Sequence, residues 1–173
     1  NPLSPYAVSK LAGEQLCGVF SSIYGLETVV LRYFNVFGER QDPSSQYAAV
    51  IPAFLEAFRT GSRPTIYGDG EQSRDFVHVD NVIDANLRAA SVRGVAGRIL
   101  NVAAGRAVTL NQLLAVMARL LGVQVDPLHA AARPGEARHT RADIAAAREA
   151  IGYEVRVSLE EGLERMVRAA VGA

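Results

Sequence analysis

A tyrosine and a lysine near the start of the chain have the types and the spacing for acid–base chemistry. Tyr6 and Lys10 are four residues apart, and Lys10 is the only lysine among the 18 basic residues. On a helix, residues i and i+4 share a face, so the phenol and the ammonium can meet the same ligand. A neighbouring positive charge favours the phenolate, which makes tyrosine a usable base near neutral pH. The alternative is that Tyr6 packs and Lys10 is solvated.

The elements around this pair must hold it in place. Ser4 can cap a helix with Pro5 at its first position, and Gly25 is a natural stop after Tyr24. Residues 27–34 are mostly apolar and β-branched, as in a strand buried on both faces of a parallel sheet, and this strand ends in Asn-Val-Phe-Gly at 35–38. A helix that feeds such a strand predicts α/β architecture.

Similar signals extend along the rest of the chain. We expect one helix over 47–60 around Pro52 and a second from a cap at Asp80 to about residue 92. A third helix is expected to follow the capping box of Thr109 and Gln112, and a fourth to follow Ser158. Short strands are expected at 65–67, 74–79 and 98–103, and a polar loop at 133–140.

Composition restricts the class of protein. With 173 residues, 49% apolar and 21% charged, the chain is typical of soluble globular domains, and its equal numbers of acidic and basic residues disfavour nucleic acid or an anionic membrane as a partner. The single cysteine, Cys17, excludes an internal disulfide, favours a cytoplasmic location and is expected in the core. The three histidines show no ligand spacing, so no metal site is expected. Because a helix is expected almost at Asn1, we expect the chain to begin inside a larger domain.

Several blocks in order resemble one enzyme family. They are NPLSPYAVSKLAGEQL, LRYFNVFG, GDGEQSRDFVHVDNV, NVAAG and RPGEARHTRAD. Together they resemble the extended short-chain dehydrogenase/reductase family, specifically its NAD-dependent UDP-hexose 4-epimerases. The run RYFNVFGERQDP followed by YAAVIP is most similar to the UDP-N-acetylglucosamine 4-epimerases.

The resemblance implies a mechanism and a cofactor. Tyr6 is implied to take the proton from the sugar 4-hydroxyl while NAD accepts the C4 hydride. Lys10 is implied to hold the nicotinamide ribose and to lower the pKa of Tyr6, and Phe34 to contact the nicotinamide end of NAD; the alternative for Phe34 is a core aromatic. By the same resemblance, the family's glycine-rich dinucleotide loop is expected upstream of Asn1.

The resemblance also implies a UDP-sugar site. Arg74 and Arg133 match two arginines that bind the diphosphate, a role that suits the fork of donors on a guanidinium, with surface salt bridges as the alternative. Glu136 stands where many relatives have Asp for the ribose hydroxyls. Thr140 is implied to be a small wall of the hexose pocket, with capping of its own loop as the alternative. The remaining implied contacts to the sugar nucleotide come from Asn35, Ala49, Val50, Thr65, Ile66 and Tyr67, most of which could equally be core residues.

The resemblance also implies a division of the chain into domains, and it leaves alternative functions open. Residues 1–46 are expected to belong to a Rossmann-type NAD domain of the doubly wound class, and 47–173 mainly to a small α/β substrate domain, with about 75–105 returning to the Rossmann sheet. The chain is then the C-terminal half of a homodimeric epimerase and inactive alone. A nucleotide-sugar 4,6-dehydratase or a UDP-glucuronate decarboxylase would share Tyr6 and Lys10. A non-catalytic nucleotide-sugar-binding module is the alternative from another class.

Overall fold

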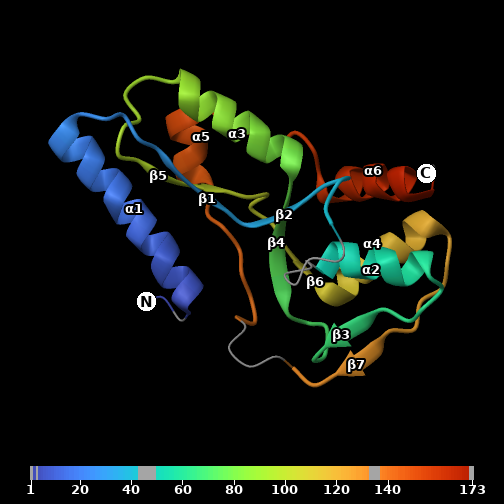
Figure 1. Ribbon diagram of the computed structural model, residues 1–173. Helices are drawn as coiled ribbons and strands as arrows, with labels where there is room; N and C mark the ends of the chain where they lie inside the picture. The colour runs from blue at the N-terminus through green and yellow to red at the C-terminus, as the bar shows by residue number, and fades with distance from the viewer. Residues whose placement is uncertain (1, 3, 43–49, 133–136, 172–173) are drawn as a thin grey trace.

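A computed structural model describes residues 2, 4–42, 50–132 and 137–171, and it confirms the α/β class (Figure 1). In Figure 1, α1 lies along one side of the molecule beside β1 and β5, while α2, α4 and α6 gather on the other side. The elements in chain order are α1 Pro5–Tyr24, β1 Val30–Tyr33, β2 Asn35–Phe37, α2 Val50–Arg59, β3 Thr65–Tyr67, β4 Ser73–His78, α3 Val79–Ser91, β5 Ile99–Val102, β6 Ala107–Thr109, α4 Leu110–Leu121, β7 Leu128–Ala130, α5 Ala145–Ile151 and α6 Leu159–Val171.

The strands form small sheets that are mainly parallel. β1 pairs with β5, with Val30 opposite Ile99, and β3 pairs with β7; both pairs are parallel. β2 pairs in parallel with β4, and β4 pairs with β6 in the antiparallel direction. The chain passes from the β1–β5 sheet to the β2–β4–β6 sheet at Phe34, whose N–H donates to the carbonyl of Val102 at 3.1 Å.

The capping signals in the sequence are confirmed at three helix ends. The Oγ of Ser4 accepts a hydrogen bond from the Ala7 N–H at 3.1 Å, and Gly25 ends α1 with a φ of 67°. Thr109 and Gln112 form a reciprocal capping box at the start of α4. These ends follow from local side-chain chemistry, which is why the sequence alone predicts them.

Other expectations need correction. The helix expected to start at a cap on Asp80 begins earlier, because the Nδ1 of His78 accepts the Asp80 N–H at 3.2 Å and makes His78 the cap. Three short elements were not expected: β6, β7 and α5. Strand β1 is also less buried than expected, since Arg32 and Tyr33 are exposed and its one paired neighbour among the described residues is β5.

Two apolar cores meet along strand β4. Phe76 belongs to one core, which α2, α4 and α6 cover, and Val77 belongs to the other, which α3, α5 and β5 cover. Consecutive side chains of a strand point to opposite faces, so a single strand can serve both cores. Tyr153 is fully buried in the second core, and its hydroxyl donates to the carbonyl of Ala103 at 2.8 Å.

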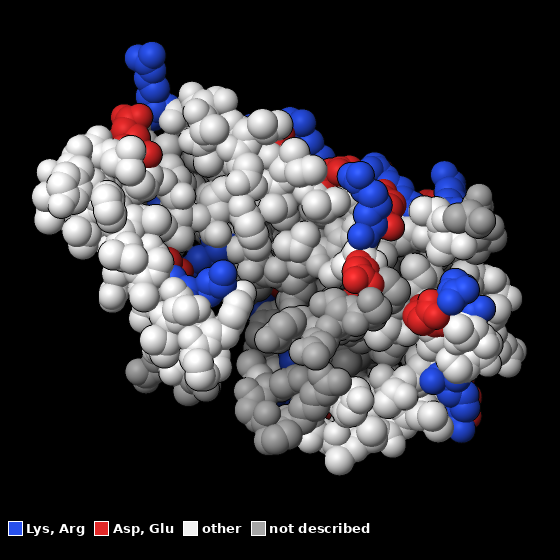
Figure 2. All heavy atoms as spheres, in the orientation of Figure 1, with Lys and Arg blue, Asp and Glu red and all other residues white. Residues whose placement is uncertain are grey.

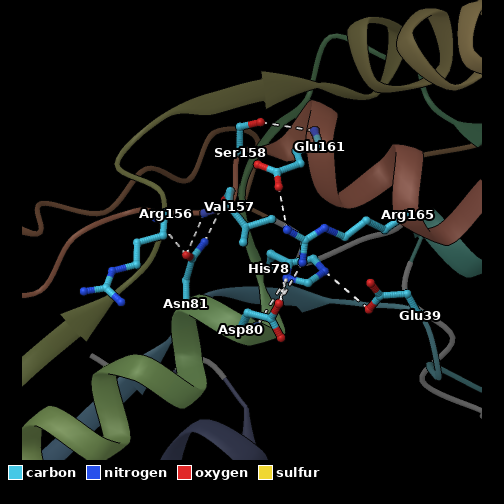
Figure 3. A network of polar contacts seen from close by, with 9 residues as sticks. All are labelled: Glu39, His78, Asp80, Asn81, Arg156, Val157, Ser158, Glu161 and Arg165. Carbon is cyan, nitrogen blue, oxygen red and sulfur yellow. Dashed lines mark hydrogen bonds and ion pairs between the residues drawn. The ribbon is translucent and has the colours of Figure 1, made fainter.

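A polar network joins the start of α3 to α6 and the segment before it (Figure 3). Asn81 is buried and its amide group both accepts and donates: Oδ1 accepts the N–H groups of Arg156 and Val157 at 2.9 and 3.0 Å, and Nδ2 donates to the Val157 carbonyl at 2.7 Å. Asp80 forms an ion pair with Arg165 of α6 at 2.9 Å. These polar contacts therefore join α3, which covers the second core, to α6, which covers the first.

Helix α1 is the exception to this packing, because none of its residues is buried. Figure 2 shows the side of the molecule where α1 lies as mostly uncharged surface. Cys17 is half-buried on this helix, which corrects its expected place in the core. No helix in the part of the chain that the structure describes combines the length and the apolar character needed to cross a membrane.

Candidate functional site

Tyr6 and Lys10 lie next to each other on the first turns of α1. The Nζ of Lys10 is 5.2 Å from the centre of the Tyr6 ring. The phenol is 71% exposed and the ammonium is exposed too, so both groups are open to a ligand. The i, i+4 spacing therefore does bring the two groups together, as expected from the helix geometry.

One ion pair fixes the same helix against β1. Glu14 lies one further turn along the stripe of Tyr6 and Lys10, and its Oε1 accepts from the Nε of Arg32 at 2.7 Å. A second bond joins the same two groups, which makes the pair bidentate. These bonds to Arg32 hold the pKa of Glu14 below its usual value. The hydroxyl of Thr28 adds a bond to the Cys17 carbonyl at 3.0 Å.

A cavity lies beside the first core, between β2, β3, β4 and α2, and buried residues of that core form part of its wall. Its volume is about 350 Å³. Five residues that the resemblance assigns to the sugar nucleotide line it, together with Gln72 and several apolar side chains. The five are Asn35, Val50, Thr65, Tyr67 and Arg74.

The polar groups of this cavity are held from behind by main-chain atoms. The Nδ2 of Asn35 donates to the carbonyl of Asp75 at 2.9 Å. The guanidinium of Arg74 donates to the carbonyls of Ser73 and Arg138 at 3.0 and 3.3 Å. Gln72 donates from its side chain to the Tyr67 carbonyl. Each of these side chains therefore has a defined orientation at the cavity wall.

The other predicted residues fall elsewhere. Ile66 is fully buried in the first core, as the core alternative for it anticipates. Phe34 is half-buried against the second core at the junction of β1 and β2. Thr140 does not line the cavity; its N–H donates to the Ser73 carbonyl at 3.1 Å, and its Oγ1 is buried without a hydrogen-bond partner among the described residues. Ala49, Arg133 and Glu136 lie outside the described residues.

Some cavity residues were not predicted from the sequence. Gln72, Phe54 and Leu110 line the cavity, but they come from different elements that only the fold brings together. Of these three, only Gln72 could have been suspected from the sequence, because it stands two residues before Arg74 in a block that carries the family resemblance. The apolar residues carry no signal that separates a cavity wall from a core position.

Comparisons with known proteins agree on one family. The family model described as NAD dependent epimerase/dehydratase matches residues 1–103. A putative UDP-glucose 4-epimerase of Methanocaldococcus jannaschii is 38% identical over 167 residues, which cover 96% of this chain and 53% of that relative. The chain thus spans about half the length of the curated relatives it matches.

Solved structures agree with this match. The UDP-glucose 4-epimerase of Thermotoga maritima, solved with UDP-glucose, has a TM-score of 0.94 at 38% identity, covering 99% of this chain and 55% of that one. The UDP-N-acetylglucosamine 4-epimerase of Methanobrevibacter ruminantium, in complex with UDP-N-acetylmuramic acid, has a TM-score of 0.93 at 40% identity, with the same coverage of 99% and 55%. The fold is therefore that of Rossmann-like epimerase structures.

Proposed function

The chain belongs to the NAD dependent epimerase/dehydratase family, and we propose that it is the C-terminal part of a UDP-sugar 4-epimerase. NAD is the cofactor of this family. The observation that carries the proposal is the cavity lined by Asn35, Thr65, Tyr67 and Arg74 in a chain that also presents Tyr6 beside Lys10.

The residues present fit NAD. Tyr6 and Lys10 supply an exposed hydroxyl and an exposed ammonium side by side, which suits the hydroxyls of a ribose. Phe34 supplies an aromatic surface where β1 ends, and open α/β sheets bind ligands beyond the carboxyl ends of their strands. When bound, NAD supplies a reversible acceptor for the hydride on C4 of the sugar.

Tyr6 is the proposed general base. Its phenolate removes the proton from the sugar 4-hydroxyl and returns a proton to the 4-oxygen when the configuration has been inverted, so the reaction needs no net acid or base. Lys10 stabilises the phenolate by its positive charge. On the substrate side, Arg74 is proposed to pair with the diphosphate, because a guanidinium matches phosphate oxygens with more than one donor.

The proposed substrate pair is UDP-N-acetylglucosamine and UDP-N-acetylgalactosamine, with UDP-glucose and UDP-galactose as the second choice. The first pair is supported by a solved relative that is named for that sugar. The resemblance adds Thr140 as a small wall of the hexose pocket, although Thr140 does not line the cavity described above. The second choice is supported by the relatives named for UDP-glucose. A 4,6-dehydratase or a decarboxylase would need further acid–base or carboxylate-binding groups outside this chain.

Replacement of Tyr6 by Phe tests the base role. In the full-length protein, Tyr6→Phe should lower kcat by at least about a hundredfold, because the proton acceptor is lost, while UDP affinity is unchanged. Tyr24→Phe is the matched control, since Tyr24 lies on the same helix and is also 71% exposed. Epimerisation rates and calorimetric UDP binding give the answer; a Tyr6→Phe enzyme as active as the control would remove Tyr6 from the mechanism.

Replacement of Arg74 tests the nucleotide site. Arg74→Ala should weaken UDP binding by about 1.5–3 kcal/mol, the range for a charge-assisted hydrogen bond, and Arg74→Lys should recover only part of this loss. Arg59→Ala is the control, because Arg59 pairs with Glu56 on α2 and does not line the cavity. Equal UDP affinities for the Arg74 and Arg59 variants would leave Arg74 without a role in binding.

A further inference from the structure

Four buried polar side chains lie close together in the sequence. Among the described residues, the polar or charged side chains that are buried are those of Ser73, Asp75, His78 and Asn81, all within nine consecutive positions. Burying such groups costs free energy unless they are hydrogen-bonded, so each needs a partner. Ser73 and Asp75 both contact residues 138–142, while Asn81 contacts residues 156 and 157, and none of the four has a role in the proposed proton transfer.

Asp75 is completely buried and faces two other segments. Its carboxylate accepts the Ala104 N–H at 2.8 Å and the Ala142 N–H at 3.1 Å. Burial raises the pKa of Asp75, and these main-chain donors act in the opposite direction by favouring the charged form. The carboxylate therefore connects the turn after β5 to the segment 138–142.

The same segment is paired with the start of β4. The Ser73 N–H donates to the Arg138 carbonyl at 2.9 Å, and the Ser73 carbonyl accepts the Thr140 N–H at 3.1 Å. The Ser73 hydroxyl lies 3.0 Å from the Nδ1 of His139. Residues 138–142 are thus fastened to β4 by Ser73 at one end and by Asp75 at the other.

One cavity residue depends on these attachments, and a second is bonded to the main chain of Asp75. The guanidinium of Arg74, between Ser73 and Asp75, uses the Arg138 carbonyl as an acceptor at 3.3 Å. The amide of Asn35 uses the Asp75 carbonyl at 2.9 Å. A shift of residues 138–142 away from β4 would remove an acceptor of Arg74 and would move Thr140.

We propose that Asp75 is a positioning residue for the sugar nucleotide: its buried carboxylate holds residues 138–142 against β4 and so orients the Arg74 guanidinium in the cavity. The inference rests on the proposed function. Asp75 does not contact the substrate in this proposal; it affects nucleotide binding through Arg74 and has no part in the proton transfer at Tyr6.

The test is an exchange of carboxylate for amide in the full-length protein. Asp75→Asn replaces one acceptor by an NH₂ group that faces main-chain donors, and we expect the Kd of UDP to rise about tenfold, the size of one lost charged hydrogen bond. The KM of the UDP-sugar should rise with it, while kcat at saturation stays within about twofold. Calorimetry with UDP gives a readout that does not depend on turnover.

Asn81→Asp is the matched control. It is the reverse isosteric exchange at another buried position of the same nine residues, and Asn81 bonds to residues 156 and 157, which do not line the cavity. The control should lower Tm and leave the Kd of UDP unchanged. If Asp75→Asn does not fold, Ser73→Ala takes its place; it removes only the hydroxyl contact to His139 and should raise the Kd about threefold.

The outcomes separate the two proposals. If the unmodified protein does not bind UDP, the proposed function fails and this inference fails with it. If it binds UDP, and Asp75→Asn, or Ser73→Ala in its place, binds UDP as tightly, the inference alone is overturned. A rise in Kd as large in Asn81→Asp would also overturn it, because general destabilisation would then explain the loss.

Discussion

At the scale of single residues, Thr140 carries the proposed choice of sugar. Its N–H is bonded to the Ser73 carbonyl, its buried hydroxyl makes no hydrogen bond among the described residues, and the residue does not line the cavity beside β4, so its role in the hexose pocket is a proposal from the resemblance. We expect Thr140→Tyr to depress turnover of UDP-N-acetylglucosamine about tenfold more than that of UDP-glucose, because overfilling a pocket acts on the larger substrate. Relative kcat/KM values for the two sugars measure this. Equal slowing of both would contradict the pocket-wall role and favour UDP-glucose as substrate.

Gly162 is a residue whose importance only the structure reveals. A Cβ at this position of α6 would lie 2.6 Å from the Cδ2 of His78 and 2.7 Å from the ring of Phe37, both buried. We expect Gly162→Ala to destabilise the protein by about 1–3 kcal/mol through overpacking, visible as a lower Tm. In an open helix position the same change would raise Tm, since Ala is the better helix former. A raised Tm would therefore show that α6 can move away from β4.

At the scale of elements, the attachment of α1 depends on few contacts. No residue of α1 is buried, and the bidentate pair of Glu14 and Arg32 joins it to β1. Because the Arg32 side chain is 49% exposed, we expect the pair to contribute only about 0.5–1 kcal/mol to folding. The pKa of Glu14 is lowered in the folded state, so this contribution is present above the pKa of the unfolded chain and is lost as the pH falls through the lowered value.

Unfolding experiments at two pH values check this contribution. The free energy of unfolding of Glu14→Gln should lie below that of the unmodified protein at pH 7, and the difference should shrink in acid, where Glu14 is protonated in both states. A difference that is the same at both pH values would mean that the charge of Glu14 is not what attaches α1.

The elements also show which parts of the fold the sequence can predict. The ends of α1 and α4 follow from local caps at Ser4, Gly25 and Thr109, which do not depend on the rest of the fold. β7 has only three residues and gains its hydrogen bonds from β3, more than 60 positions earlier, so no local pattern announces it. Helix α5 begins at Ala145, and its N-cap residue, Ile144, provides no side-chain hydrogen bond. Short elements stabilised by distant partners are therefore missed.

At the scale of the whole molecule, the site was predictable only in part. The spacing of Tyr6 and Lys10 is a local property of a helix, and the structure does bring the two side chains together. The cavity, in contrast, takes its walls from β2, α2, β3 and β4, and nothing in the sequence separates Val50, which lines it, from Ile66, which is in the core. Strand alternation and helix packing decide between these outcomes, and both depend on tertiary contacts.

The uncharged face of α1 leads to a prediction about assembly. Leu16, Val19, Phe20 and Ile23 are 46–68% exposed and recur at intervals of three and four residues, so they form one stripe. Tyr6, Lys10 and Glu14 recur at intervals of four and form another. A stripe of this kind in water favours association with a second apolar helix face. We propose that the stripe joins two copies of the full-length protein as a homodimer, leaving the Tyr6 stripe free for the cofactor.

A charge placed in the middle of this stripe tests the dimer. Phe20→Glu should convert a dimer into a monomer, because pairing through a two-fold axis would bury two carboxylates close together without partners. Leu128→Glu is the control, since Leu128 is 44% exposed but lies on β7, away from α1. Sedimentation velocity measures the mass of each variant. If the unmodified protein is already a monomer, the α1 stripe does not join two copies and packs against another part of the same polypeptide. If Phe20→Glu stays a dimer, the two copies meet at a surface other than the α1 stripe.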